Sequence, residues 1–246
     1  MDGTVLGLFL LAAFLGGLTN GLTGFALGLV VSGIWLHIIT PLQTATLIVG
    51  YSLITQGYGI WKLRHSLNWR NVAPFIIGGM IGVPLGAMLL AHANPAYLRI
   101  GVGVLLVIYS LYSLLRPKLK PVGSSISIDV GIGALNGLLA GLTGLVGVVV
   151  TIWCQLRGLP KDIQRTTFQP VMFASGCVTA VSLSIAGAVT AETVKLYFLG
   201  LPMMLIGMWS GFRLYGKLND EAFRKIILLL LLVSGVMLVV PLSWFS

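Results

Sequence analysis

Long apolar runs, separated by short polar or charged segments, make up most of this 246-residue chain. A helix crosses a hydrocarbon layer of about 30 Å in about 20 residues. Runs close to that length predict single membrane-crossing helices at residues 42–61, 72–91, 97–115, 166–191, 194–212 and 226–245. Hydrophobic residues make up 57% of the chain and charged residues 9%, which agrees with this pattern. The sequence therefore predicts an all-α polytopic membrane protein.

Two further runs, residues 4–36 and 126–156, are too long for one crossing and short for two. A straight helix of about 33 residues would extend for roughly 50 Å. Near its middle each run carries a related motif, GLTNGLTG at 17–24 and GLLAGLTG at 137–144. Glycine lowers helix stability by about 1 kcal/mol, and small polar side chains can pair with backbone groups that a break exposes. We expect each run to be a broken or hairpin helix.

The basic residues favour hairpins over straight helices. If every run crossed once, the 15 Lys and Arg residues would divide almost equally between the two sides. If the two long runs enter and leave on the same side, all basic residues except Arg99 and Lys195 fall on one face. The positive-inside rule selects this second topology. It places both termini outside and four loops in the cytoplasm, at residues 62–71, 116–122, 157–165 and 213–225.

The two halves of the chain match at fixed offsets. With an offset of 120, the glycines, leucines and threonine of the first motif align with those of the second. With an offset of 125, Gly82 and Gly86 align with Gly207 and Gly211. Each half holds one hairpin and three crossings, an odd number, so we predict an inverted repeat with residues 1–120 as the first copy and 121–246 as the second. Inverted repeats are typical of secondary transporters, whose sites lie near the bilayer midplane.

A half-helix that begins inside the membrane directs free N–H groups and the positive end of its dipole into the protein. This arrangement favours an anion, and nearby amides or hydroxyls add neutral hydrogen bonds. The alternative is close helix packing through small residues. For Arg165 the alternatives are a topology signal and a snorkelling anchor, and for the glutamines the alternative is a structural hydrogen bond between helices. The candidate substrate-binding residues are Asn20, Gly21, Thr23, Gly24, Gln56, Asn136, Gly141, Thr143, Gly144, Arg165 and Gln169.

The predicted spans lack the side chains that a proton relay, a metal site or an enzyme active site would need. No carboxylate lies deep in a predicted span, whereas proton relays use Asp, Glu or His inside the membrane. Cys154 and Cys177 have neither CxxC spacing nor a neighbouring histidine, so we expect no metal or other cofactor. Paired carboxylates or an activated nucleophile are also missing, which argues against an intramembrane enzyme or an assembly factor. The net charge of +9 sits in short loops, where it sets topology rather than binding nucleic acid.

The broken first run followed by PLQTATL at 41–47, with GLTGLVG at 141–147 and LRGLPKDIQRTT at 156–167, resembles the TauE/SafE sulfite exporter family over nearly the whole chain. The resemblance implies a transporter of the bacterial cytoplasmic membrane that exports sulfite or a sulfonate such as taurine or sulfoacetate. It implies a role for the motif positions Gly21, Thr23, Gly24, Gly141, Thr143 and Gly144. An uptake permease or a channel for another small anion stays an alternative. The expected partners are the lipid bilayer and a small anionic substrate, and homodimerisation is left open.

Overall fold

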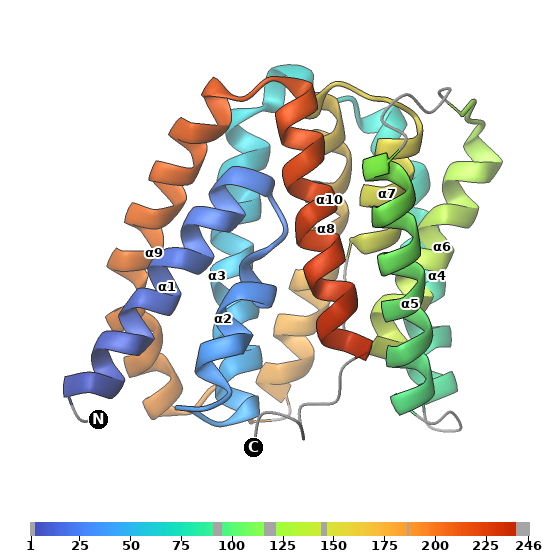
Figure 1. Cartoon of the computed structure of the whole chain (residues 1–246). Helices are drawn as coiled ribbons and strands as arrows, with labels where there is room; N and C mark the ends of the chain where they lie inside the picture. Colours follow the sequence, from blue (N-terminus) through green and yellow to red (C-terminus); the bar gives the residue numbers. More distant parts are fainter. Residues whose placement is uncertain (1–2, 91–94, 116–121, 144–146, 186, 240–246) are drawn as a thin grey trace. The chain divides into compact units, whose positions relative to one another are not determined.

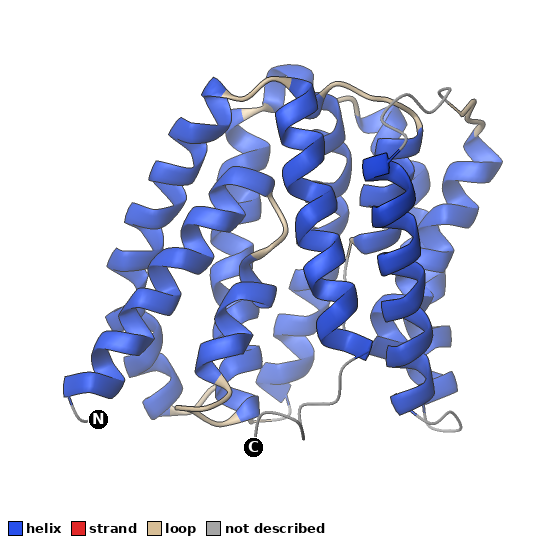
Figure 2. Ribbon diagram, viewed as in Figure 1, coloured by secondary structure: helices blue, strands red, loops and turns tan. Residues whose placement is uncertain are grey.

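A computed structural model of the chain describes residues 3–90, 95–115, 122–143, 147–185 and 187–239 (Figure 1). All regular secondary structure in these ranges is helical, as the apolar runs predict (Figure 2). By length and hydropathy alone, three helices of the described residues qualify as membrane spans: Gly3–Thr23, Lys161–Ile185 and Ala191–Lys217. The chain is a multi-pass, all-α membrane protein.

The helices follow the predicted runs in order. They are α1 (Gly3–Thr23), α2 (Leu27–Trp35), α3 (Pro41–Lys62), the short 3-10 helix η1 (Arg64–Ser66), α4 (Trp69–Leu90), α5 (Pro95–Leu115), α6 (Ile126–Thr143), α7 (Val148–Leu156), α8 (Lys161–Ile185), α9 (Ala191–Lys217) and α10 (Asp220–Val239). Residues 240–245 of the last predicted run lie outside the described residues.

The helix α8 lies several residues nearer the N-terminus than the apolar run predicted at 166–191. The helix α8 already begins at Lys161, where the Gln164 N–H donates to the Pro160 carbonyl at 2.9 Å. After α8 the chain turns through Gly187 with φ +72°, and the Thr190 hydroxyl accepts the Thr193 N–H at 3.2 Å to cap α9. Hydropathy measures how apolar a segment is, so it does not detect these caps, which set where a helix begins.

The first long run forms a hairpin. The chain leaves α1 through Gly24, which has φ +90°, and α2 runs back along α1. Near the other end of the hairpin, the Trp35 indole N–H donates to the Phe9 carbonyl at 3.2 Å, and the two rings stack with centroids 5.0 Å apart. The end of α2 therefore lies beside the first half of α1, which confirms the hairpin and excludes a single straight helix.

The second long run also folds back on itself. Residues 144–146, between α6 and α7, lie outside the described residues. The Trp153 indole N–H of α7 donates to the Asp129 carboxylate of α6 at 2.9 Å, and Arg157 pairs with the same carboxylate at 3.6 Å. Both returning arms, α2 and α7, have 9 residues. A helix of that length extends for about 14 Å, so each returning arm is re-entrant rather than a full crossing.

The chain divides into two compact units. The first contains α1, α2, α3, α9 and the part of α8 from Met172 onward. The second contains α4 to α7, the part of α8 up to Val171, and α10. Each unit thus combines helices from both predicted repeats.

Glycines allow the backbones of two helix pairs to touch. In the first unit α1 packs along α9, and a Cβ at Gly207 would overlap the Phe14 carbonyl oxygen. In the second unit α4 packs along α6, and a Cβ at Gly82 would overlap the Ala134 carbonyl oxygen. The two glycines are separated by 125 residues, and their two partners by 120. The same contact therefore recurs at both offsets that relate the predicted repeats.

A second pair of contacts recurs in the same way. A Cβ at Gly17 would overlap the Met204 carbonyl oxygen in the first unit, and a Cβ at Gly137 would press on the Gly79 carbonyl oxygen in the second. These partners are again related by offsets of 120 and 125. Close backbone approach through small residues is a common way for membrane helices to associate.

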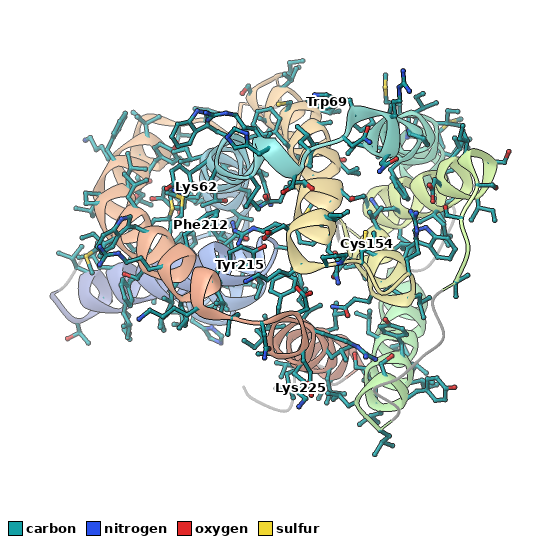
Figure 3. All side chains as sticks on the ribbon, turned by 90° about the horizontal axis from the view of Figure 1, so that it is seen from above. Lys62, Trp69, Cys154, Phe212, Tyr215 and Lys225 are labelled. Carbon is teal, nitrogen blue, oxygen red and sulfur yellow. The ribbon has the colours of Figure 1, made fainter. Side chains whose placement is uncertain are left out.

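In the first unit α3 and α9 run in the same direction. Tyr51 stacks on Tyr197 near one end, with centroids 4.7 Å apart, and Tyr58 meets Phe212 edge-on near the other, at 4.9 Å. Figure 3, a view from above, labels Lys62, the last residue of α3, and Phe212, which lies near the end of α9. The loops that follow α3 and α9 therefore leave the first unit at the same end, as the predicted topology requires.

Cysteine labelling tests the predicted orientation. In a variant lacking Cys154 and Cys177, we expect an impermeant thiol reagent applied to intact cells to label His37→Cys and not His65→Cys. Both positions are exposed, and the 22 residues of α3 separate them, enough for one crossing. Permeabilised cells, in which both positions should react, are the control. Labelling of both cysteines from outside intact cells would contradict the topology.

Exchange of glycines on α1 tests the backbone contact. Gly17→Ala should lower the free energy of unfolding by about 1–3 kcal/mol, because the methyl group overpacks against α9. Gly7→Ala is the matched control, since no atom lies within 4 Å of its Cβ position. It should leave stability unchanged or raise it by up to about 1 kcal/mol through helix propensity. Thermal unfolding in detergent measures both, and equal melting temperatures would show that the contact adds nothing.

Candidate functional site

Buried amides from two helices meet at the break between α1 and α2. The Gln56 side chain of α3 donates from Nε2 to the Gly24 carbonyl at 2.9 Å. One residue earlier on α3, the Thr55 hydroxyl oxygen accepts an N–H from Asn20 of α1. The side chains of Asn20 and Gln56 are both 1% exposed. The structure thus brings together three of the predicted residues, Asn20, Gly24 and Gln56, within the first unit.

The orientation of the Asn20 amide follows from its partner. The Thr55 hydroxyl donates its single proton to the Ser52 carbonyl at 3.0 Å. Its oxygen is then an acceptor toward Asn20, so the Asn20 NH₂ group, and not its carbonyl, must face Thr55. Thr55 is a member of this cluster that sequence reasoning missed, because a threonine in an apolar helix carries no signal of its own.

The helix α2 begins at this break. Its N-cap residue is Ala26, whose methyl side chain cannot accept a hydrogen bond. The first helical bond of the arm runs from the Val30 N–H to the Ala26 carbonyl at 3.3 Å. The first-turn N–H groups of α2 therefore have no side-chain cap and give this end of the helix a partial positive charge.

Two predicted residues of the first motif make contacts within the helix bundle. A Cβ at Gly21 would overlap the Met208 carbonyl oxygen of α9, so this glycine lies in the contact between helices. The Thr23 hydroxyl donates to the Thr19 carbonyl one turn earlier, at 2.8 Å. The contacts of Gly21 and Thr23 are thus those expected of helix packing. The hydroxyl proton of Thr23 is already donated within α1.

The second hairpin repeats part of this arrangement. The N-cap of α7 is Gly147, with φ +84° and no side-chain cap. Asn136 of α6 is 1% exposed, and its carbonyl oxygen has no hydrogen-bond partner among the described residues. Gly141 and Thr143 lie in the last turn of α6, and Gly144 lies outside the described residues.

Arg165 and Gln169 lie one turn apart on α8, in the second unit, and both are 0% exposed. A snorkelling side chain keeps its charged end in water, so the burial of Arg165 excludes that alternative. Neither polar atom of the Gln169 amide has a partner among the described residues, and the same holds for Gln155 of α7. Gln155 was missed because its position near the end of an apolar run resembles an interfacial residue.

The Asp129 cluster is a second feature that the sequence did not reveal. Besides Trp153 and Arg157, the Ser124 hydroxyl donates to the Asp129 carboxylate at 2.6 Å. These contacts hold the two ends of the second hairpin together, and we call this cluster the Asp129 clasp. Because its carboxylate is paired with a guanidinium, the clasp has the chemistry of a structural ion pair.

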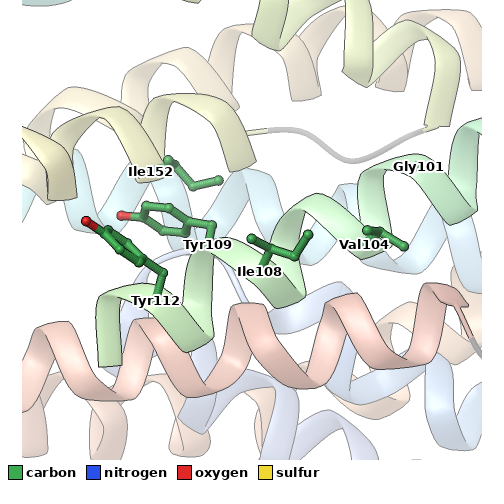
Figure 4. A pocket seen from close by; sticks show the side chains of 6 residues that line it. All are labelled: Gly101, Val104, Ile108, Tyr109, Tyr112 and Ile152. Atoms are coloured by element: carbon green, nitrogen blue, oxygen red, sulfur yellow. The ribbon is translucent and has the colours of Figure 1, made fainter. Parts of the chain in front are cut away.

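The cavities in each unit are apolar. A cavity of about 580 Å³ in the second unit is lined by Gly101, Val104, Ile108, Tyr109, Tyr112 and Ile152, as Figure 4 shows. Another, of about 250 Å³, lies between α3, α8 and α9 in the first unit. None of the predicted binding residues lines either cavity, and the polar cluster at the first break is closed to solvent in this structure.

Comparison with known proteins supplies the family. A family model described as sulfite exporter TauE/SafE matches residues 9–238, a range that includes most of the first hairpin, the whole second hairpin and the buried amides. No curated protein and no solved structure matches the chain. The match covers nearly the whole length that the motifs predicted. The chain therefore belongs to the TauE/SafE sulfite exporter family.

Proposed function

We propose that this protein is a secondary transporter that exports a small sulfur-containing anion, such as sulfite or a sulfonate, across the cytoplasmic membrane. The observation that carries the proposal is the start of α2 beside the buried amides of Asn20 and Gln56. Uncapped N–H groups at the positive end of a helix suit a compact anion with several acceptor oxygens. Sulfite and sulfonate groups have that chemistry.

The recurring glycine contacts support alternating access. The contact of Gly207 with α1 and that of Gly82 with α6 are related by the offsets of the predicted repeats. Two copies of one fold in opposite orientations can exchange conformations, which opens a site first to one side and then to the other. In this proposal residues 1–120 and 121–246 are the two copies.

Arg165 of the second unit is a further candidate residue. It is fully buried one turn from Gln169 on the same helix, and its guanidinium carries a permanent positive charge. We propose that Arg165 and Gln169 attract and orient the anion during transport, and that Asn136 of α6 supplies a neutral hydrogen bond.

The driving force needs no acidic relay in this proposal. The Asp129 carboxylate, the acid nearest to a span interior among the described residues, is paired with Arg157. An anion that leaves a cell with a negative interior gains about 2.3 kcal/mol per charge per 100 mV. Membrane potential alone can therefore drive export.

Binding to the purified protein tests the substrate class. Sulfite, taurine, sulfoacetate and thiosulfate are compared with chloride and acetate at equal ionic strength, and we expect at least one sulfur anion to bind more than about tenfold tighter than chloride, a difference of about 1.4 kcal/mol. Counterflow in proteoliposomes then distinguishes a saturable transporter from a channel. Equal binding of all six anions would refute the substrate class.

Two substitutions at the first break distinguish binding from packing. Asn20→Ala should weaken sulfur-anion binding about tenfold, because it removes the amide that joins α1 to Thr55 at the break. Thr23→Val is the matched control: its hydroxyl already donates within α1, so affinity should change less than about twofold, since the loss falls on a helix-internal bond. Melting temperatures of both variants separate lost binding from lost folding. Equal effects of the two substitutions would contradict a binding role for the Asn20 cluster.

A further inference from the structure

We propose that Gln56 makes the site select anions that carry an N–H or O–H donor over anions that carry none. The inference rests on the proposed function and adds a selection rule among the sulfur anions. Its basis is the amide group of Gln56, which is 1% exposed and lies at the break where α2 begins.

The orientation of this amide is fixed by its partners. The Gly24 carbonyl can only accept, so the contact at 2.9 Å must come from the Gln56 NH₂ group. The same nitrogen lies 3.7 Å from the Met172 sulfur, a weak acceptor that takes the second N–H. Both protons of the amide are therefore used by the protein, and rotating the amide by 180° would set two carbonyl oxygens against each other.

The side-chain carbonyl oxygen of Gln56 accepts no hydrogen bond from the described residues. It is also buried. A buried acceptor without a donor is unfavourable, and a ligand that supplies the donor recovers that free energy on binding. An anion that presents only acceptor oxygens cannot do so, and it would also repel the carbonyl dipole.

The break thus presents two complementary groups. The N–H groups at the start of α2 attract a negative oxygen, and the Gln56 oxygen accepts a proton donor. Gly24, which holds Gln56, lies three residues before Leu27, the first residue of α2, so both groups belong to the same break. Hydrogensulfite, which has an O–H, and sulfonates with a hydroxyl or ammonium group satisfy both.

Three sulfonates of similar size test this rule on the full-length purified protein. Taurine carries an ammonium group, isethionate carries a hydroxyl group, and ethanesulfonate carries neither. We expect taurine and isethionate to bind about tenfold tighter than ethanesulfonate, the usual effect of leaving a buried polar group unpaired. Gln56→Met keeps the length of the side chain and removes the acceptor, so it should make the three affinities equal. Gln43→Met, on the same helix but in its exposed N-terminal cap, should keep the preference.

The outcomes separate this inference from the function on which it rests. Equal binding of all three sulfonates to the unmodified protein, each still tighter than chloride, would overturn the donor rule and leave the transporter intact. A preference for taurine alone would overturn it in favour of a site for positive charge. Sodium-dependent binding without a preference would assign the Gln56 oxygen to a cation and overturn it as well. If neither sulfite nor any sulfonate binds better than chloride, the proposed function fails and the rule fails with it. The comparison of the three sulfonates on the unmodified protein tests the donor rule even if the Gln56→Met variant does not fold.

Discussion

Backbone groups inside a hydrocarbon layer must be paired within the protein, and the organisation of this chain around its two hairpins depends on that constraint. A helix that stops inside the membrane leaves carbonyl and N–H groups without helical partners. At the first break the protein pairs one of them, the Gly24 carbonyl, with Gln56 from α3. The N–H groups at the start of α2 have no side-chain cap. The break therefore combines a satisfied carbonyl with N–H groups that have no side-chain cap, and the proposed anion site rests on this imbalance.

The same hairpins require close contact with a neighbouring helix. A broken helix has less of its own hydrogen bonding to hold it straight, so its long arm is supported by packing. The glycines of α1 and α9 let the two backbones touch over successive turns, and α4 and α6 do the same in the second unit. Gly21 takes part in this support through its contact with the Met208 backbone. The glycine-rich motif thus has two roles, and different residues of it carry them. Gly17 and Gly21 allow the backbone contact with α9, and Gly24 forms the break.

Span length and loop charge were enough to predict the hairpins, because both follow from bilayer thickness and topology. Gln56 and Asn20 were also identified from sequence, since an amide in an apolar run needs a partner. The direction of the Thr23 hydroxyl and the Asp129 clasp were not predictable. Whether a hydroxyl donates within its own helix or to a neighbouring helix depends on local geometry. The clasp joins Asp129 to Trp153, 24 positions later, and the sequence alone does not show that these two residues meet. The ends of α8 differ from those of the apolar run for a related reason, because caps depend on single residues and not on average hydropathy.

The two hairpins are closed by related contacts of different chemistry. In the first, the Trp35 indole donates to the backbone of Phe9; in the second, the Trp153 indole donates to the carboxylate of Asp129, the residue 120 positions later. The predicted topology accounts for the difference. In that topology the first hairpin opens toward the outer face, where basic residues are few, and an aromatic stack closes it without charge. The second hairpin would open toward the cytoplasm, where Arg157 would be a topology signal and would stabilise the acid beside it. The same charge would then both orient the protein in the membrane and hold its second hairpin closed.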